Sequence, residues 1–558
     1  MAGPDLRSPE AIGRAINDAA EHYRQGRLDD ADRLCTRILK AAPDHFDALH
    51  LAGLVKLDAG KAAAAQGLLA RALKLQPGSA PVLANLGRTL SALNRDDEAL
   101  AAIDKALTLA PTSFEALNHR GNVLLKLGRA QEAAEAFGRV MAIEPRFLGA
   151  RANLGSALAG LGRFEEAVAQ YDALLAAHPS HPETLSNRGT ALTSLGRLDE
   201  AIASFDRALA LRPDYIKARL GRGVALAARN RHREALADYD AVLAADRSNA
   251  DAAHNAALSR LTLGDYRRGF EQYEARWQRT GMPRRKSLGK PLWLGEYPLA
   301  RKTILVPAEQ GLGDTIQFAR YAAPLAKSGA RVVLEVQPEL VSLLSRLDGV
   351  AAVVARGEAL PPYDVHCPAG SLPRALRTEL ASVPAQVPYL AAGEERVARW
   401  RERIAQLPAP RIAIAWSGRA AHANDRNRSI PLERMAPLFA AARGSLVSIQ
   451  RELRDGDAET LARLAGVTHV GDALADFDDT AAVLALCDLL ISVDTSVVHL
   501  AGALARPVWV LVPFQPDWRW LLDRADSPWY PTARLFRQPQ PGDWDDVIRQ
   551  AGEALLKL

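Results

Sequence analysis

A glycine-rich segment that follows a short apolar run carries the carboxylate best suited to acid–base chemistry. The run TILVP, from residue 303, leads into Glu309-Gln310-Gly311-Leu312-Gly313-Asp314-Thr315 and then into a helical stretch. Gly311 and Gly313 allow a tight turn and let a ligand approach the first N–H groups of the helix, which favour anions. Asp314 could accept a proton from an incoming hydroxyl, or it could cap the helix. Both interpretations stay open.

A second polar segment, residues 416–431, also stands between an apolar run and a helical one. Ser417 and Gly418 open it, and Arg426 and Arg428 lie near the start of the helix that follows. The planar guanidinium fork matches the oxygens of a diphosphate. This segment therefore predicts a phosphate site, with a solvated loop as the alternative.

A third polar segment, DTSVVHLAGA from residue 494, ends the apolar run DLLISV and opens a helix of small residues. Thr495 and Ser496 could hold a phosphate with their amide and hydroxyl groups, because the amino end of a helix carries partial positive charge. Asp494 and His499 complete the segment. The alternatives are that Asp494 caps the helix and that His499 is a hydrogen-bonded core histidine.

Alternating strands and helices must position these three segments. Apolar runs such as TILVP, RVVLEV, RIAIAWS, DLLISV and PVWVLVP alternate with helical stretches from Lys302 onward. This order predicts two successive α/β sheets with mainly parallel strands and helices on both faces. Ligands of such sheets collect at the carboxyl ends of the strands, where all three segments stand.

The amino-terminal half has a repeat of 34 residues. Proline recurs at that interval, and glycine does so in the same rhythm, at Pro43, Pro77, Pro111, Pro145, Pro179 and Pro213 and at Gly53, Gly87, Gly121, Gly155, Gly189 and Gly223. A small and a large apolar residue stand four positions apart in each unit, as do Ala133 and Phe137, so both lie on one helix face. The pattern resembles the tetratricopeptide repeat and predicts about eight units over residues 12–283.

The resemblance to tetratricopeptide repeats implies a concave groove that holds a protein or peptide partner. A spacer or dimerisation arm is the alternative. The period ends after Trp277 in a stretch rich in proline, glycine and basic residues, and we place a linker at residues 284–300. Trp293 in this linker is expected to pack against the second half, because an exposed tryptophan would leave a large apolar surface in water.

Composition narrows the class of protein. With 558 residues, 48% hydrophobic and 24% charged, the chain is globular and too long for one core. No apolar run has the roughly 18 residues that span a bilayer, the amino terminus lacks the features of an export signal, and three scattered cysteines fit a reducing compartment. We therefore expect a soluble, cytoplasmic protein. A net charge of +5 spread along the chain argues against nucleic acid as a partner.

The carboxy-terminal half resembles a known enzyme family. The segments EQGLGDTIQFARYA and DTSVVHLAGAL, and the order of the two sheets, are similar to the bacterial lipopolysaccharide heptosyltransferases and their relatives (glycosyltransferase family 9-like). Together with the repeats, PLWLGE and PDWRWLLDRADSPWYP resemble bacterial repeat-containing glycosyltransferase-like proteins. The resemblance spans residues 290–558. It implies a helical solenoid followed by an α/β module of the GT-B type, whose two Rossmann-like lobes, 301–392 and 393–558, face each other across a cleft.

The same resemblance implies inverting, metal-independent transfer of a sugar from a nucleotide-sugar donor, without a further cofactor. Asp314 corresponds to the candidate general base. Asp494, Thr495 and His499 match the segment that meets the donor phosphate, although this chain has Ser496 where the family has glycine. Arg428 corresponds to a basic residue after the strand RIAIAWS. The remaining predicted donor-binding residues are Gly311, Gly313, Ser417, Gly418 and Arg426.

The sequence thus predicts a glycosyltransferase of the hexosyl-, heptosyl- or pentosyltransferase type, whose repeats recruit a protein or glycan acceptor. The alternative is a non-catalytic interaction scaffold with a degenerate GT-B module. Ser496 and the short first sheet favour the scaffold. The joint presence of Asp314, Asp494, Thr495 and His499 favours the enzyme, since a site without chemistry has no need of all four polar groups.

Overall fold

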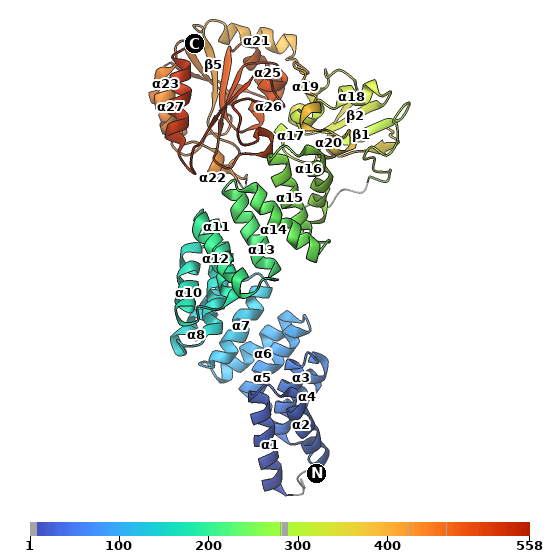
Figure 1. Ribbon diagram of the computed structural model, residues 1–558, viewed down its shortest axis with the longest axis vertical. Coiled ribbons are helices and arrows are strands. Elements are labelled where there is room, and N and C mark those ends of the chain that lie inside the picture. The colour runs from blue at the N-terminus through green and yellow to red at the C-terminus, as the bar shows by residue number, and fades with distance from the viewer. Residues whose placement is uncertain (1–7, 280, 282–287, 423, 465) are drawn as a thin grey trace. The chain divides into compact units, whose positions relative to one another are not determined.

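The structure, a computed structural model, describes residues 8–279, 281, 288–422, 424–464 and 466–558 (Figure 1). The chain forms two compact units, Met1–Ala225 and Leu226–Leu558. Residues 284–287 of the predicted linker lie outside the described residues. So do residues 1–7, on which part of the expectation about export rests.

Helix pairs make up the first unit. From α3 to α12, helices of 13 and 14 residues alternate, as the 34-residue period predicts. The helices are α1 (Pro9–Arg24), α2 (Leu28–Ala41), α3 (Phe46–Asp58), α4 (Ala62–Leu75), α5 (Ala80–Ala92), α6 (Asp96–Leu109), α7 (Phe114–Lys126), α8 (Ala130–Ile143), α9 (Leu148–Gly160), α10 (Phe164–Ala177), α11 (Pro182–Ser194) and α12 (Leu198–Leu211), and α13 (Ile216–Ala228) crosses the boundary between the units.

The repeated glycine marks the place where the two helices of a pair touch. A Cβ atom added at Gly121 would lie 2.5 Å from the ring of Phe137, and one at Gly87 would lie 2.3 Å from Cγ1 of Ile103. The large residue sixteen positions after the glycine therefore fills the space that a side chain would need. This contact explains why glycine and the large apolar residue share one period.

Three more helices open the second unit: α14 (His232–Ala245), α15 (Ala250–Thr262) and α16 (Tyr266–Tyr273), followed by the 3-10 turn η1 (Glu274–Gln278). A four-stranded parallel sheet comes next, with the order β3-β2-β1-β4. Its strands are β1 (Thr303–Pro307), β2 (Arg331–Val336), β3 (Val350–Ala355) and β4 (Val365–His366).

The second sheet has six parallel strands in the order β10-β9-β8-β5-β6-β7. Its strands are β5 (Arg411–Ala415), β6 (Ser445–Ser448), β7 (Val467–His469), β8 (Leu489–Val493), β9 (Val508–Val512) and β10 (Ala533–Arg537). The helices of this region that bear on the site are α17 (Leu312–Ala319), α20 (Leu372–Ala375), α22 (Asp425–Arg428) and α26 (Ser496–Ala503), with the 3-10 turns η3 (Ala369–Ser371) and η7 (Trp518–Trp520). The other helices are α18 (Ala322–Lys327), α19 (Val341–Leu344), α21 (Glu394–Ile404), α23 (Ala436–Ala441), α24 (Asp457–Arg463), α25 (Phe477–Ala485) and α27 (Trp544–Leu555).

The predicted α/β region with parallel sheets is confirmed, with two differences in detail. The single helix expected after TILVP is divided into α17 and α18. Pro324 explains the break, because proline cannot donate to the carbonyl of Arg320 and its ring crowds that carbonyl. Strands β4 and β10 were not among the predicted runs. Strand β4 has only two residues, too few to form a recognisable apolar run.

The last repeat shares a hydrophobic core with the α/β region. Tyr266 and Phe270 of α16 pack edge-on against Trp518, and the Trp529 indole N–H donates to the Tyr266 hydroxyl at 3.0 Å. Figure 1 shows α16 beside α17 and α20. Trp293 is 5% exposed within the same core, as its sequence context predicts. The carboxy-terminal sheets are therefore not packed independently of the last repeat.

Among the described residues, the helices are all too short or too polar to cross a lipid bilayer.

Candidate functional site

Two of the three predicted segments meet where their strands end. Helix α17 follows β1, and α26 follows β8 after a short polar turn. A Cβ atom added at Gly313 would lie 2.7 Å from Cδ2 of His499 and 3.3 Å from Cα of Ser496. Glycine at this position therefore lets the amino ends of the two helices approach closely, and segments 180 residues apart form one surface.

Asp314 lies in the first turn of α17, and both its carboxylate oxygens have partners. Oδ2 accepts a hydrogen bond from the Gly311 backbone N–H at 2.9 Å, and Oδ1 accepts one from Arg519. The capping interaction considered from the sequence is thus present. The side chain keeps 26% of its surface exposed. Since an ionised carboxylate has about four acceptor positions, a ligand hydroxyl can still share an oxygen.

Arg519, which the sequence did not single out, joins the elements around Asp314. It lies in η7, and its guanidinium donates to Asp314, to Gln317 and, at 2.9 Å, to Asp517. The guanidinium also stacks on Trp518, with its carbon 4.4 Å from the ring centroid. Burial alone would lower the pKa of Arg519, but Asp517 and Asp314 outweigh burial and raise that pKa. The arginine is therefore a permanent buried cation beside the candidate base.

The second predicted segment approaches the third through Arg428. Its Nη1 donates to the backbone carbonyl of Asp494 at 3.0 Å, and a Cβ atom added at Gly418 would lie 2.4 Å from Nη2. Nε makes no hydrogen bond with any residue that the structure describes. Burial, followed by repulsion from Asp517, raises the pKa of the Asp494 carboxyl above its usual range. Gly418, Arg428 and Asp494 thus lie close together.

Ser417 and Arg426 lie differently from their neighbours in this segment. Ser417 is buried, and its backbone N–H and carbonyl both bond to the Gln450 side chain at 3.2 Å. Arg426 is exposed and has no ion pair or hydrogen bond within the described part of the chain. The geometry therefore brings Arg428, rather than Arg426, to the strand ends.

Helix α26 begins at Thr495 without a side-chain cap. The first N–H groups of an uncapped helix have no partner within the helix and are able to bind an anion. His499, one turn later, is buried, and its Nδ1 lies 3.0 Å from the Tyr530 hydroxyl. Burial, followed by repulsion from Arg519, lowers the pKa of His499 well below its usual value. This is the hydrogen-bonded core histidine considered from the sequence, neutral at physiological pH.

A second buried cluster, missed from the sequence, holds the segment before Asp314. Arg276 of η1 donates from Nη2 to Glu309 at 2.9 Å and to the Ser371 hydroxyl at 2.7 Å. The Gln310 amide donates to the Tyr273 hydroxyl at 2.6 Å. Burial raises the pKa of Glu309 to about 7, although Arg276 opposes the rise. The residues just after the last repeat therefore fix the loop that leads to the candidate base.

Comparison with known protein families identifies the repeat in the helical half. Models of the tetratricopeptide repeat match residues 19–80 and 152–216, residues 56–118 and 192–266, and residues 114–147. The helical half is an array of tetratricopeptide repeats. The prediction from the 34-residue period is confirmed.

Among curated proteins, Protein FlbA of Caulobacter vibrioides is 27% identical over 325 residues, which are 53% of this chain and 53% of that protein. The chain spans about half the length of this curated relative. Among solved structures, a tetratricopeptide repeat protein from Parabacteroides merdae is 17% identical and covers 44% of this chain and 98% of its own, with a TM-score of 0.36. YrrB, a repeat protein with an unusual peptide-binding site, is 24% identical over 33% of this chain and 96% of its own, with a TM-score of 0.29.

Proposed function

We propose that this chain is a glycosyltransferase that moves a sugar from a nucleotide-sugar donor to an acceptor hydroxyl, with inversion and without a metal ion. In this proposal residues 301–392 and 393–558 are the two lobes of a GT-B module. The repeats recruit the acceptor or its carrier by protein–protein contact. The observation that carries the proposal is the juxtaposition of the Gly313 turn with the uncapped start of α26.

Each residue then has a distinct task. The N–H groups at Thr495 and Ser496 and the guanidinium of Arg428 bind the donor diphosphate, because both offer hydrogen bonds to anionic oxygens. His499 contributes a fixed neutral ring rather than charge, since burial keeps its pKa low. Asp314 accepts the proton of the acceptor hydroxyl as the new glycosidic bond forms and the nucleoside diphosphate leaves. Arg519 holds the Asp314 carboxylate in place.

The experiment uses the full chain, because Tyr266 and Phe270 complete the core of the α/β region. Nucleoside diphosphates are titrated calorimetrically, and release of the diphosphate from nucleotide-sugars is measured with and without acceptor glycans. Arg428→Met should weaken the binding of the preferred nucleotide about tenfold or more, since it removes a charge-assisted hydrogen bond. Arg443→Met is the matched control, because that exposed arginine lies just before β6, at the amino end of a strand rather than at the carboxyl ends that carry the site.

Asp314→Asn separates chemistry from binding. It should keep nucleotide affinity and lower turnover by about 10²–10⁴-fold, the usual contribution of a general base. Full turnover in this variant would show that another group takes the proton.

A second candidate function is a binding scaffold built on the same module. It is favoured by one observation: Asp314 already accepts hydrogen bonds on both oxygens, so it serves the fold as well as a ligand. The scaffold predicts that a nucleotide binds without turnover, or that none binds, while the repeats still capture a partner. Turnover that depends on Asp314 would exclude it.

A further inference from the structure

The segment PDWRW, residues 516–520, is one of those that carry the resemblance to glycosyltransferase-like proteins, and the proposed function uses only its arginine. It begins shortly after β9, and β9 lies beside β8 in the sheet, with Leu511 opposite Val493. Because the two strands are parallel, the loop after β9 leaves the sheet at the same edge as the turn that leads into α26. Ligands of parallel sheets collect at this edge. Asp517, which belongs to this loop, therefore lies at the edge that carries the proposed donor site.

Asp517 has one carboxylate oxygen that the fold leaves available. Its Oδ1 accepts hydrogen bonds from the Arg519 backbone N–H at 3.0 Å and from Nη1 of the Arg519 guanidinium at 2.9 Å. The other oxygen, Oδ2, has no hydrogen bond or ion pair within the part of the chain that the structure describes. This oxygen is not a buried atom, and the side chain is 36% exposed, so a ligand can reach it.

One guanidinium holds both Asp517 and the candidate base Asp314. Nη1 of Arg519 donates to Asp517, and Nη2 donates to Asp314. Since the two nitrogens belong to one planar group, the two carboxylates lie next to each other. Asp314 uses both of its oxygens within the fold, whereas Asp517 keeps one available. A hydroxyl group bound to Asp517 therefore lies beside the carboxylate that is proposed to accept the proton.

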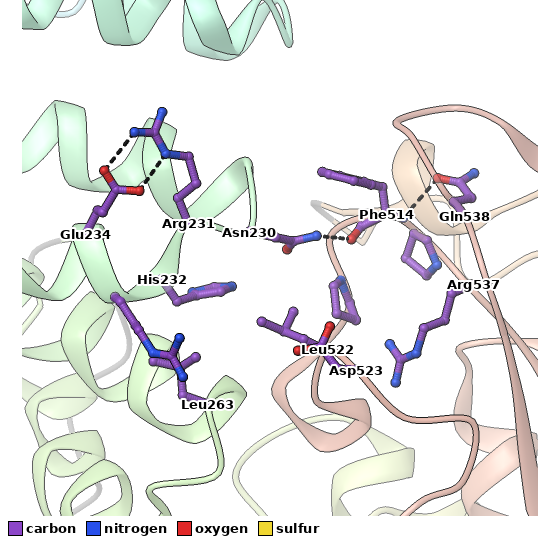
Figure 2. Close-up of a pocket in the computed structure, with 13 residues that line it drawn as sticks. Asn230, Arg231, His232, Glu234, Leu263, Phe514, Leu522, Asp523, Arg537 and Gln538 are labelled. Carbon is purple, nitrogen blue, oxygen red and sulfur yellow. Dashed lines mark hydrogen bonds and ion pairs between the residues drawn. The ribbon is translucent and has the colours of Figure 1, made fainter.

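The loop that carries Asp517 is fixed on both sides. Before it, the Phe514 carbonyl accepts from the Asn230 amide at 2.6 Å and the Phe514 N–H donates to Oε1 of Gln538 at 2.9 Å, along the wall of a cavity of about 410 Å³ (Figure 2). After it, Trp518 is buried in the core that α16 shares with the sheets. A carboxylate held in this way loses little conformational entropy when it binds a ligand.

The charges around Asp517 disfavour an anionic group on the ligand. Asp314 is adjacent, and burial, followed by repulsion from Asp517, raises the pKa of the Asp494 carboxyl above its usual range. Arg519, the cation between Asp314 and Asp517, already bonds to both carboxylates. A carboxylate on the ligand would therefore meet like charges at this point. An ionised carboxylate only accepts hydrogen bonds, so the ligand group that Asp517 binds must be a donor such as a hydroxyl.

We propose that Asp517 determines the specificity for the donor sugar, accepting a hydrogen bond from a hydroxyl of the transferred ring and selecting a neutral sugar over a uronic acid. This inference rests on the proposed function. With the diphosphate at the start of α26 and the acceptor hydroxyl at Asp314, the transferred sugar lies between them, beside Asp517. A site built to bind a substrate hydroxyl discriminates strongly against the analogue that lacks it, because the polar group of the protein then stays unpaired.

The test is calorimetric titration of the full chain with the preferred nucleoside diphosphate and with its conjugates to neutral hexoses and pentoses, to their monodeoxy analogues and to hexuronic acids. The wild type should bind the best neutral conjugate at least about tenfold more tightly than the hexuronic acid conjugate and than one monodeoxy analogue. Asp517→Asn keeps an acceptor for Arg519 and replaces the free oxygen with an amide donor. It should weaken the best neutral conjugate about tenfold or more, abolish the preference over that monodeoxy analogue, and leave the affinity for the diphosphate alone unchanged.

Asp526→Asn is the matched control, because Asp526 also pairs with an arginine two residues away, Arg524, but does so at the surface. It should change none of these affinities, and urea unfolding verifies that both variants are folded. The inference is overturned, while the proposed function stands, if the diphosphate binds but Asp517→Asn binds the neutral conjugate as tightly as the wild type does. An equal loss of diphosphate and conjugate affinity would assign Asp517 a merely structural role and overturn the inference as well. If no nucleoside diphosphate binds the wild type, the proposed function fails and this inference fails with it.

Discussion

Replacing Arg519 with methionine should destabilise the second unit by about 2–4 kcal/mol. The guanidinium is only 8% exposed and serves two carboxylates, Asp314 and Asp517, together with the Gln317 amide. Removing one partner of a buried ion pair costs about 3–5 kcal/mol, because the remaining charge is left uncompensated. The side chains of Asp314 and Asp517 remain 26% and 36% exposed to solvent, so water compensates part of this loss. The expected destabilisation therefore lies at the lower end of that range.

Tryptophan fluorescence during urea unfolding measures this change in the second unit alone. All nine tryptophans, from Trp277 to Trp544, belong to Leu226–Leu558. The free energy of unfolding follows from the midpoint and slope of that transition. Circular dichroism follows the helices of both units in the same samples. The part of its transition that tryptophan fluorescence does not show belongs to the first unit and should not change.

Arg524→Met is the control, because Arg524 forms a pair of 2.6 Å hydrogen bonds with Asp526 at the surface of the same region. Exposed ion pairs contribute about 0–1 kcal/mol, so this variant should remain close to the wild type. When Asp314→Asn and Asp517→Asn are both present, the loss of unfolding free energy caused by Arg519→Met should fall by about half or more, because no carboxylate is then left unpaired. If Arg519→Met is no more destabilising than Arg524→Met, Arg519 does not hold the two carboxylates, and the geometry proposed for Asp314 is wrong.

Four further substitutions test the packing and the charge of the chain. Gly313→Ala should destabilise the second unit by about 1–3 kcal/mol in urea, since the new methyl group meets the fixed His499 ring at 2.7 Å; an unchanged midpoint would contradict the close approach of the two helices. The raised pKa of Glu309, about 7, means that its protonated form favours the folded state. The stability should therefore fall by up to about 3 kcal/mol between pH 4.5 and 7, and Glu309→Gln should flatten that slope, whereas equal slopes would refute the assignment. Gly121→Ala should destabilise the first unit by about 1–3 kcal/mol by circular dichroism, because Phe137 fills the site, whereas Gly138→Ala, with open space around it, should stabilise it by about 0.5–1 kcal/mol.

The repeats were predictable from the sequence because each unit contacts mainly its neighbours. A local period of proline and glycine is therefore enough to define the helices. The parallel strands were predictable for a similar reason: buried strands are continuous apolar runs. Strand β4 escaped because two residues make no run.

The candidate site was only partly predictable. The positions of Asp314, Arg428 and His499 at strand ends follow from the alternation of strands and helices. Arg519 and Arg276 could not be found in this way, because Asp314 and Glu309, the partners through which they join the site, stand 205 and 33 residues away. Buried ion pairs of this kind depend on tertiary packing. The alternation of tryptophan and arginine around Arg519 was the available signal, since a charged residue between buried tryptophans needs a partner.

The core that α16 shares with Trp518 and Trp529 constrains how such a chain can change by gene duplication. Upstream of α13, whole units of 34 residues can be gained or lost, because each affects only its neighbours. Loss of α16 would uncover Trp518 and Trp529 and remove the residues that precede Arg276. In homologous chains, variation in repeat number should therefore occur in the first unit, while the final repeat is inherited together with the sheets.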